Sequence, residues 1–422
     1  MRKIISLIIV CTIIISGMFI YKKNDNKTLT DDNSGFVIAA VIDGKASTSF
    51  PTTNKYAASV ECTRNGVKQD VGAKITWDGS KWVVSVDDIG ASNVRCNANF
   101  ETPVTFKETI LANNTVKTPM TTPGVAISTS DEALLASAED DYGTSYYFRG
   151  AVTNNYVQFA NKCWRIVRVA GDNTVKLVLH NNNSSNVNNP CAASNNDFGV
   201  AYIGDYAFNT SYNDNAYVGF MYGTSGSSNY ASTHANTNKS TILTNLEAWY
   251  TNNLASYASK ITDTVWCNDK NVSSSSYNPF NYTMDSTKLG YSTNVTYYAA
   301  MERLVSSSRA AGGAGTSLKC NGDLSKISSK IGLLTIDEVA FAGSIYDTSS
   351  SYSYLNENTS GSWWTMTPAF YNDVSAVWHV NSDGYLGYGG SHLELSVRPS
   401  ISLISAIEVS GKGTSDNPYV VN

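Results

Sequence analysis

The chain begins with a long apolar run that is enclosed by basic residues. Two basic residues precede the run, which extends from Ile4 to Tyr21, and two lysines follow it. A run of about 17 to 25 residues can cross a bilayer, whereas the apolar core of a signal peptide usually has about 7 to 15. We therefore expect residues 1–23 to be an uncleaved signal-anchor, with the rest of the chain outside the cell. Cleavage near Ser16 and Gly17, followed by secretion, is the alternative.

The cysteine count fits export. The chain has seven cysteines, of which Cys11 lies in the apolar run, so six remain for the exported part. An even number of cysteines in an exported chain indicates disulfides. The simplest arrangement joins sequence neighbours, and we expect the pairs Cys62–Cys96, Cys163–Cys191 and Cys267–Cys320. Reduced, buried cysteines are the alternative. The cysteines lack the close spacing of zinc ligands, so we expect no metal site.

Length and charge narrow the class of protein further. A chain of 422 residues is too long for one ordinary core, which favours two or three domains. Only 15% of the residues are charged and the net charge is −5, with no basic stripe. We therefore expect no nucleic-acid partner. Abundant Asn, Ser, Thr and Tyr are typical of an extracellular surface.

The pattern of strands, turns and linkers divides the exported part. After the anchor, short alternating runs with a hairpin signal at Asp78-Gly79 predict strands. A Thr- and Pro-rich stretch with one short helix follows, and then a longer folded region that ends in a short tail. We expect a polar spacer at 24–35, a small all-β sandwich domain at 36–106 and a linker at 107–140. An α+β domain at 141–408 and a C-terminal tail at 409–422 follow.

Two helical segments support the α+β class for the longer region. In 241–258, apolar residues recur at helical spacing. Thr335 and Glu338 have the spacing of a capping box, and Gly343 follows in a stop position. We therefore interpret Asp337 and Glu338 as residues that begin a helix rather than as a catalytic carboxylate pair. The run 165–180 predicts a β-hairpin, and long Asn/Ser/Gly loops separate these elements.

Several motifs together resemble a known domain. "TSYYFRGAVTNNYVQFANKCWRIVRVAGDNTVKLVLH", "NLEAWYTNN", "ITDTVWCNDK", "LLTIDEVAFAG", "WWTMTPAF", "VNSDGYL" and "SVRPSISL" are similar to an uncharacterised domain in surface proteins of low-GC Gram-positive gut bacteria. Its closing segment resembles the C-type-lectin-like fold, which formylglycine-generating enzymes and retroelement-encoded variable receptors share. The resemblance implies a C-type-lectin-like α+β domain behind the sandwich.

This resemblance separates core residues from candidate contacts. It implies that Trp363, Trp364, Val397, Arg398 and Pro399 belong to the core and its scaffold, with Arg398 as a half-buried donor to loop carbonyls. The residues between these two blocks lie nearer to turns and are better candidates for exposure. The candidate ligand-binding residues are Tyr371, Asn372, Asp373, Trp378, Tyr385, Tyr388 and His392.

The sequence lacks the signatures of a formylglycine-generating enzyme, of a calcium lectin and of a serine hydrolase. A formylglycine-generating enzyme needs late cysteines, but Cys320 is the last one. A calcium lectin would carry a Glu-Pro-Asn or Gln-Pro-Asp triplet, and neither occurs. There is no G-x-S-x-G motif, and the histidines lie in unrelated contexts, at positions His180, His234, His379 and His392. We expect no enzyme activity and no cofactor.

Two function classes remain. Aromatic, Asn-rich loops suit recognition, because Tyr and Trp give contact area at low entropic cost while Asn and Ser give adaptable hydrogen bonds. We therefore expect a cell-surface recognition or adhesion protein that binds a glycan or a protein. A structural envelope or stalk protein without a specific soluble ligand is the alternative. A diversified receptor would also fit the resemblance, although one sequence contains no record of diversification.

Overall fold

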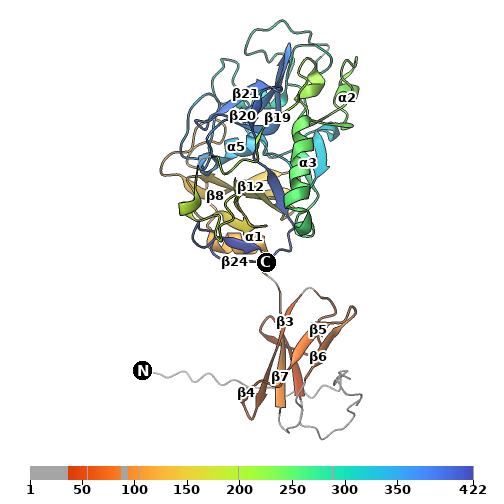
Figure 1. Cartoon of the computed structure of the whole chain (residues 1–422), viewed down its shortest axis with the longest axis vertical. Coiled ribbons are helices and arrows are strands. Elements are labelled where there is room, and N and C mark those ends of the chain that lie inside the picture. The colour runs from red at the N-terminus through yellow and green to blue at the C-terminus, as the bar shows by residue number, and fades with distance from the viewer. Residues whose placement is uncertain are drawn as a thin grey trace. The chain divides into compact units, whose positions relative to one another are not determined.

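The computed structural model shows a chain in two compact units, with the boundary between Val104 and Thr105 (Figure 1). Among the residues that the structure describes, strands account for 35% and helices for 14%. The structure describes residues 37–54, 56–86, 94–102, 104–197, 199–287 and 289–421.

The first unit contains only strands in its described part. Five of them form a sheet in the order β2-β1-β7-β3-β4, and the hairpin β5–β6 adds apolar residues to the same core. Buried and exposed side chains alternate along β7, as expected for a strand with one face on a core. This agrees with the all-β character expected for 36–106. The strands are β1 (Val37–Ile42), β2 (Lys45–Ser47), β3 (Ala57–Arg64), β4 (Val67–Gln69), β5 (Lys74–Trp77), β6 (Trp82–Ser85) and β7 (Val94–Glu101).

The second unit is organised around two larger sheets. The eight-stranded sheet consists of β8 (Ala133–Asp140), β9 (Gly143–Gly150), β10 (Tyr156–Phe159), β11 (Lys162–Val169), β12 (Val175–Asn181), β23 (Ser400–Leu403), β24 (Val409–Ser410) and β25 (Tyr419–Val421). The six-stranded sheet consists of β13 (Asp205–Ala207), β17 (Thr296–Tyr297), β19 (Trp363–Asn372), β20 (Val374–Val380), β21 (Leu386–Gly390) and β22 (Glu394–Ser396). Two small sheets pair β14 (Met221–Tyr222) with β15 (Asn238–Lys239), and β16 (Thr264–Cys267) with β18 (Lys326–Ser329).

The α-helices of the described chain are short. They are α1 (Phe106–Asn113), α2 (Tyr230–Thr233), α3 (Thr241–Asn253), α4 (Ala299–Leu304) and α5 (Ile336–Ala342). The capping box predicted at Thr335 and Glu338 is confirmed at the start of α5, where each residue's side chain accepts from the other's backbone N–H.

The expected α+β, C-type-lectin-like fold of 141–408 is wrong. The chain is mostly β, with several sheets, and among the described helices only α3 exceeds eight residues. A seven-residue helix such as α5 is about 10 Å long and cannot form a layer over a sheet. The two predicted helices are therefore too small a part of this region to make it an α+β domain. The stretches between the predicted elements contain short strands, such as β13 and β14.

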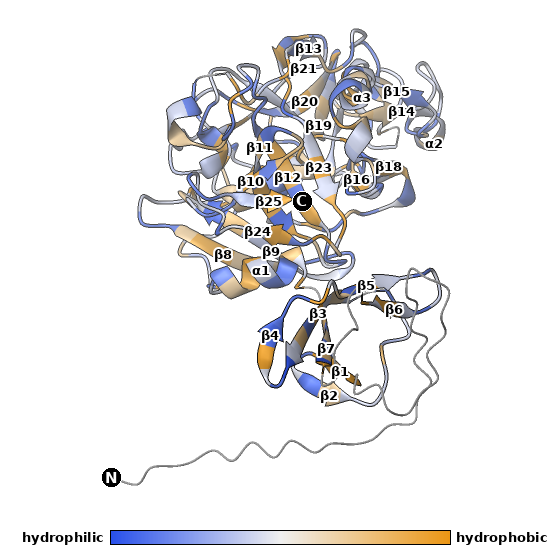
Figure 2. Cartoon of the chain, turned by 60° about the horizontal axis from the view of Figure 1, so that its bottom comes forward, coloured by the Kyte–Doolittle hydropathy of each residue, from blue (hydrophilic) through white to orange (hydrophobic). Residues whose placement is uncertain are grey.

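The core of the second unit lies on its central strands. Every residue of β12 is buried, and hydrophobic residues are concentrated on β10, β11, β12 and β25 (Figure 2). The prediction that the two late blocks are core is confirmed, because Trp363, Trp364, Val397 and Arg398 are buried. Arg398 donates to backbone carbonyls, as expected, but it is fully buried rather than half-buried, and one acceptor, Leu179 at 2.7 Å from Nε, belongs to strand β12 rather than to a loop.

Two segments at the edges of the second unit join its large sheet. The stretch expected as a linker, 107–140, contains most of α1 and all of β8, and β8 pairs with β9 along its whole length. The expected tail, 409–422, contains β24 and β25, and β25 runs parallel to β10. Both segments thus take part in the fold.

All three expected disulfides are present. Cys62 lies directly opposite Cys96 in the β3–β7 ladder, and the other pairs are Cys163–Cys191 and Cys267–Cys320. Disulfides persist in oxidising compartments, so the chain is an extracellular or secreted protein.

The expected signal-anchor (1–23) and spacer (24–35) lie outside the described residues. Within the described ranges, none of the helices is long and apolar enough to cross a membrane. Membrane anchoring therefore stays a prediction.

Candidate functional site

A network of charged side chains lines a hollow in the second unit. Glu338, at the start of α5, accepts from Lys176 on β12 and from Arg168 on β11, with Oε2–Nζ and Oε1–Nε distances of 2.7 and 2.9 Å. Arg168 also contacts Asp140 at 2.7 Å. These contacts fasten α5 to the large sheet.

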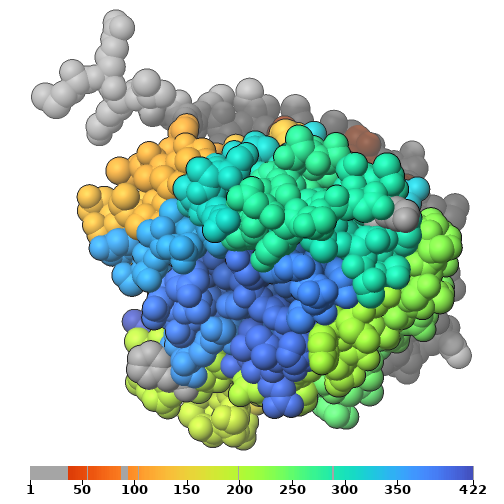
Figure 3. Space-filling view, turned by 90° about the horizontal axis from the view of Figure 1, so that it is seen from above, coloured from red at the N-terminus to blue at the C-terminus, as the bar shows by residue number. Residues whose placement is uncertain are grey.

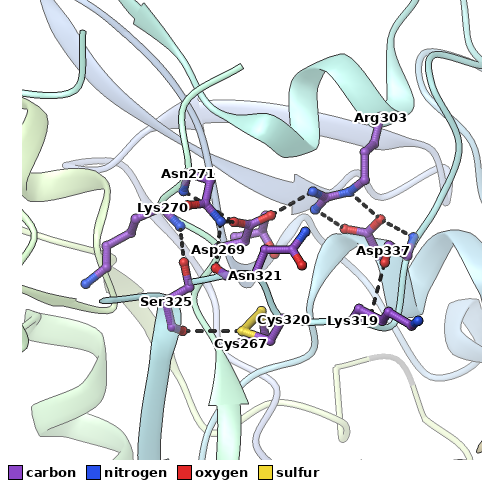
Figure 4. A network of polar contacts seen from close by, with 12 residues as sticks. Cys267, Asp269, Lys270, Asn271, Arg303, Lys319, Cys320, Asn321, Ser325 and Asp337 are labelled. Atoms are coloured by element: carbon purple, nitrogen blue, oxygen red, sulfur yellow. Dashed lines mark hydrogen bonds and ion pairs between the residues drawn. A yellow bond between two sulfur atoms is a disulfide. The ribbon is translucent and has the colours of Figure 1, made fainter. Parts of the chain in front are cut away.

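Arg303 forms the second half of this network, between two aspartates (Figure 4). Its guanidinium makes a bidentate contact with Asp337, at 3.0 and 2.7 Å, and a third contact with Asp269 at 2.7 Å. Figure 4 shows the Cys267–Cys320 disulfide beside this group. Arg303 lies on α4 and Asp337 on α5, so the ion pair joins two helices.

The electrostatics of the network favour a structural role. Burial alone would raise the pKa of Glu338, but Lys176 and Arg168 outweigh it and lower the pKa to about 2. Every carboxylate of the network described here, namely Glu338, Asp140, Asp337 and Asp269, is paired with a cation. None of these carboxylates is therefore a free base. The hollow offers about 40 Å³, far below the roughly 300 to 1,000 Å³ of pockets for drug-sized ligands. It is therefore a poor site for an organic ligand.

A group of half-buried rings on the six-stranded sheet is the better candidate site. We define the aromatic patch as Phe280, Tyr282, Tyr346, Phe370 and Tyr388, all of which are partly exposed. Phe370 and Tyr388 meet edge to face with centroids 4.9 Å apart, and Tyr346 stacks on Tyr388 at 6.2 Å. Phe280 touches both Phe370 and Tyr388, at 6.3 and 6.2 Å. The rings therefore form one continuous surface.

The sheet register explains why the rings of the strands share a face. Directly opposed residues of antiparallel strands point to the same side of a sheet. Tyr297 of β17 lies opposite Phe370 of β19, and Trp378 of β20 lies opposite Tyr388 of β21. Tyr297 and Trp378 are buried and form the floor below the patch.

The loop that carries Phe280 and Tyr282 is held in place by side-chain contacts. Asn278 bonds to the Tyr282 backbone twice, donating to its carbonyl at 2.8 Å and accepting from its N–H at 3.0 Å. Arg309 donates to the Pro279 carbonyl at 2.7 Å and places its guanidinium 5.1 Å from the Phe280 ring. Tyr282 stacks on Tyr297 with an interplanar angle of 6°. The patch is thus arranged before any ligand arrives.

The space-filling view shows the segments that contribute to this face (Figure 3). The blue segment around 360–395 lies beside the teal segment around 270–310, in agreement with the β17–β19 pairing. Segments that are far apart in sequence therefore build one surface.

The structure divides the predicted ligand-binding residues. Tyr388 belongs to the aromatic patch. Asn372, Asp373 and His392 lie at the surface, with Asp373 at the turn between β19 and β20. Tyr385 is partly exposed in the turn before β21.

Two of the predicted contacts need correction. Tyr371 and Trp378 are 2% and 0% exposed, so neither can touch a ligand directly. Trp378 lies within β20 of the six-stranded sheet, away from the turns. Tyr371 does lie next to the β19–β20 turn, but its side chain is covered. Trp378 is covered by Tyr346 and Tyr388, with ring centroids 6.1 and 5.9 Å away.

Sequence reasoning missed four members of the patch, namely Phe280, Tyr282, Tyr346 and Phe370. The available signal was the "YNPFNY" stretch, which carries three rings within a polar loop. A polar loop with this many rings has to bury them or present them to a partner.

No family model, curated protein or solved structure matches this chain. The family resemblance suggested by the sequence motifs therefore stays a prediction. Across the residues that the structure describes, no three His, Cys, Asp or Glu side chains are placed to hold a metal ion.

Proposed function

We propose that this chain is an exported, non-catalytic recognition protein that binds a glycan or a protein of a cell surface through the aromatic patch. The observation that carries the proposal is the gathering of five partly exposed rings from separate segments on one face of a sheet. Rings that served only the core would be covered.

The geometry of the patch favours binding on energetic grounds. Tyrosine and phenylalanine have few rotatable bonds, so a contact costs little side-chain entropy. The bonds from Asn278 and Arg309 fix the loop in advance, which lowers the ordering cost on association.

The histidines give no support to catalysis. Burial lowers the pKa of His234 to about 3 and that of His379 to about 4, so both stay neutral at physiological pH. His180 is fully buried and its Nε2 lies 3.1 Å from the Asn358 amide. Throughout the described chain, no histidine is hydrogen-bonded to a serine hydroxyl or a carboxylate, as a hydrolase would require.

Location follows the same proposal. We infer that residues 1–23 anchor the chain in the cell membrane as a single pass, with the two units outside. Secretion after signal cleavage is the alternative, and it leaves the same recognition surface free in the medium.

Arrays of glycans and of host surface proteins, probed with the purified protein with and without calcium, test the function. Binding should fall at least tenfold in Tyr282→Ala and Phe280→Ala. Tyr352→Ala is the matched control, because this ring is 39% exposed and lies outside the patch. A blank array would contradict the proposal and favour the structural envelope protein. Equal losses in all three variants would also contradict a specific role of the patch.

A further inference from the structure

Another hollow lies at the start of α3, and its lining residues are mostly uncharged, unlike those of the charged network. It is lined by the loop 209–211, by Tyr217 and Tyr222, by Lys239 of β15, and by the first turns of the helix. Its volume is about 260 Å³, far more than the 40 Å³ of the charged hollow. Pockets for drug-sized ligands span about 300 to 1,000 Å³, so this one suits a single small ring.

The lining is almost wholly neutral. No carboxylate borders the hollow, and its one cation, Lys239, is held 2.6 Å from Glu247. A charged ligand would have to break that pair or face uncharged groups. A ligand rich in hydroxyl groups needs neither.

Several polar groups in the hollow have no other use. In the described structure, the phenol hydroxyls of Tyr217 and Tyr222 and the amide of Asn245 make no hydrogen bond within the chain. Ser211 likewise has a free hydroxyl. Asn209 differs, because its amide donates to the Tyr217 carbonyl at 3.0 Å and fixes the wall. The hollow thus offers donors and acceptors on a rigid frame.

Two rings complete the arrangement. Tyr217 and Tyr222 meet edge to face, with centroids 5.4 Å apart and an interplanar angle of 65°. Tyr222 is held by the pairing of β14 with β15, opposite Asn238. A pyranose presents C–H groups on its face and hydroxyls on its rim, and these match a ring wall surrounded by amide and hydroxyl groups.

We propose that this hollow, the tyrosine pocket, binds one neutral hexopyranose unit of a glycan. The inference deepens the proposed function, on which it rests, because it selects a glycan over a protein as the ligand class. The aromatic patch would then contact further parts of the same ligand or a separate one, while the tyrosine pocket reads a single sugar.

Saturation-transfer NMR with the whole protein tests the pocket. The probes are the methyl glycosides of glucose, galactose, mannose and N-acetylglucosamine, with N-acetylneuraminic acid as a charged comparison. We expect transfer to at least one neutral sugar, and a loss of at least tenfold in affinity in Tyr222→Ala and Asn245→Ala. Tyr222→Phe keeps the ring and should show a smaller loss. Tyr352→Ala should bind as the unchanged protein does.

The outcomes separate this inference from the proposed function. Absence of transfer from every neutral sugar, or stronger and salt-sensitive binding of the acidic sugar, would overturn the pocket. Asn245 is partly exposed on a helix, so its variant tests the pocket even if Tyr222→Ala is unstable. If array binding is lost in Tyr282→Ala but kept in Tyr222→Ala and Asn245→Ala, the pocket fails while the patch stands.

Discussion

Lys176 and Glu338 form a buried ion pair, with Nζ 2.7 Å from Oε2 and both side chains less than 10% exposed. Glu338 contacts Arg168 as well, so one carboxylate faces two cations. Its second role is to cap α5, where it accepts from the Thr335 N–H at 3.0 Å. One side chain therefore fixes both the position of α5 and its first turn. The loss of its charge should affect the whole unit.

Acid should destabilise the protein through Glu338. Its folded-state pKa is lowered to about 2 from an ordinary 4.5, so the unfolded state binds more protons between these values. The stabilisation is therefore complete above pH 4.5 and is lost as the pH falls toward 2. The lost free energy of unfolding should be about 3 kcal/mol. Denaturant unfolding between pH 6 and 3 measures the larger part of this loss, about 2 kcal/mol, and Glu338→Gln should be less stable and lack this part of the slope. An unchanged slope in that variant would contradict the assignment.

Lys270 should also make stability rise with pH, but in an alkaline range rather than an acidic one. Its buried Nζ donates to the carbonyls of Met221 and His234 and to the Asn236 side chain, at 3.0, 2.7 and 2.6 Å, and its described contacts include no carboxylate. Burial lowers the pKa of Lys270 to about 7 from 10.5. The unfolded state binds more protons between these values, so stability should rise by a few kcal/mol from pH 7 toward 10.5.

Unfolding curves at pH 6, 7, 8 and 9, without added thiols, measure this rise. Lys270→Met keeps a similar length without a titrating group and serves as the comparison. If the variant and the unchanged protein gain stability equally with pH, then Lys270 is not the source.

The disulfides should differ in resistance to reduction. Cys163 and Cys191 are both fully buried, whereas Cys267 is partly exposed at the edge of the charged hollow. Thiol–disulfide exchange requires access of the attacking thiolate. Mild reductant followed by alkylation and peptide mapping should therefore show Cys267 and Cys320 labelled first.

Non-reducing mapping should return three intrachain links, and free thiols at any of these pairs would contradict the pairing.

How much of this could be read from sequence depends on the range of the interactions. The disulfides and the α5 capping box were predictable, because spacing and local pattern determine them. The core role of the "WW" and "VRP" blocks was an implication of the family resemblance, and these blocks are buried. The overall class was not, since the short strands β13, β14 and β22 have no pattern of their own and exist only through distant partners such as the β13–β22 ladder. Their formation depends on tertiary pairing rather than local propensity.

The candidate site shows the same limit. Tyr388 could be proposed from its place near a turn, but its neighbours Phe280 and Tyr346 come from segments about 40 to 110 residues away. Whether a ring is exposed depends on what covers it, and a single strand does not contain this information. Trp378 is an example, because it lies directly opposite Tyr388 on the neighbouring strand and was predicted to be a contact residue as well. Unlike Tyr388, it is fully buried.

Trp378 and Tyr282 should therefore behave differently when each is replaced by alanine. Trp378 is fully buried beneath Tyr346 and Tyr388, so Trp378→Ala should cost about 3 to 5 kcal/mol of unfolding free energy. Tyr282 is partly exposed, so Tyr282→Ala should cost less than about half of that while removing a ligand contact. Thermal and denaturant unfolding of both variants, with Trp378→Phe as the milder comparison, measures the difference. If Trp378→Ala is as stable as Tyr282→Ala, then Trp378 does not support the patch from below, and the distinction between floor and contact residues fails.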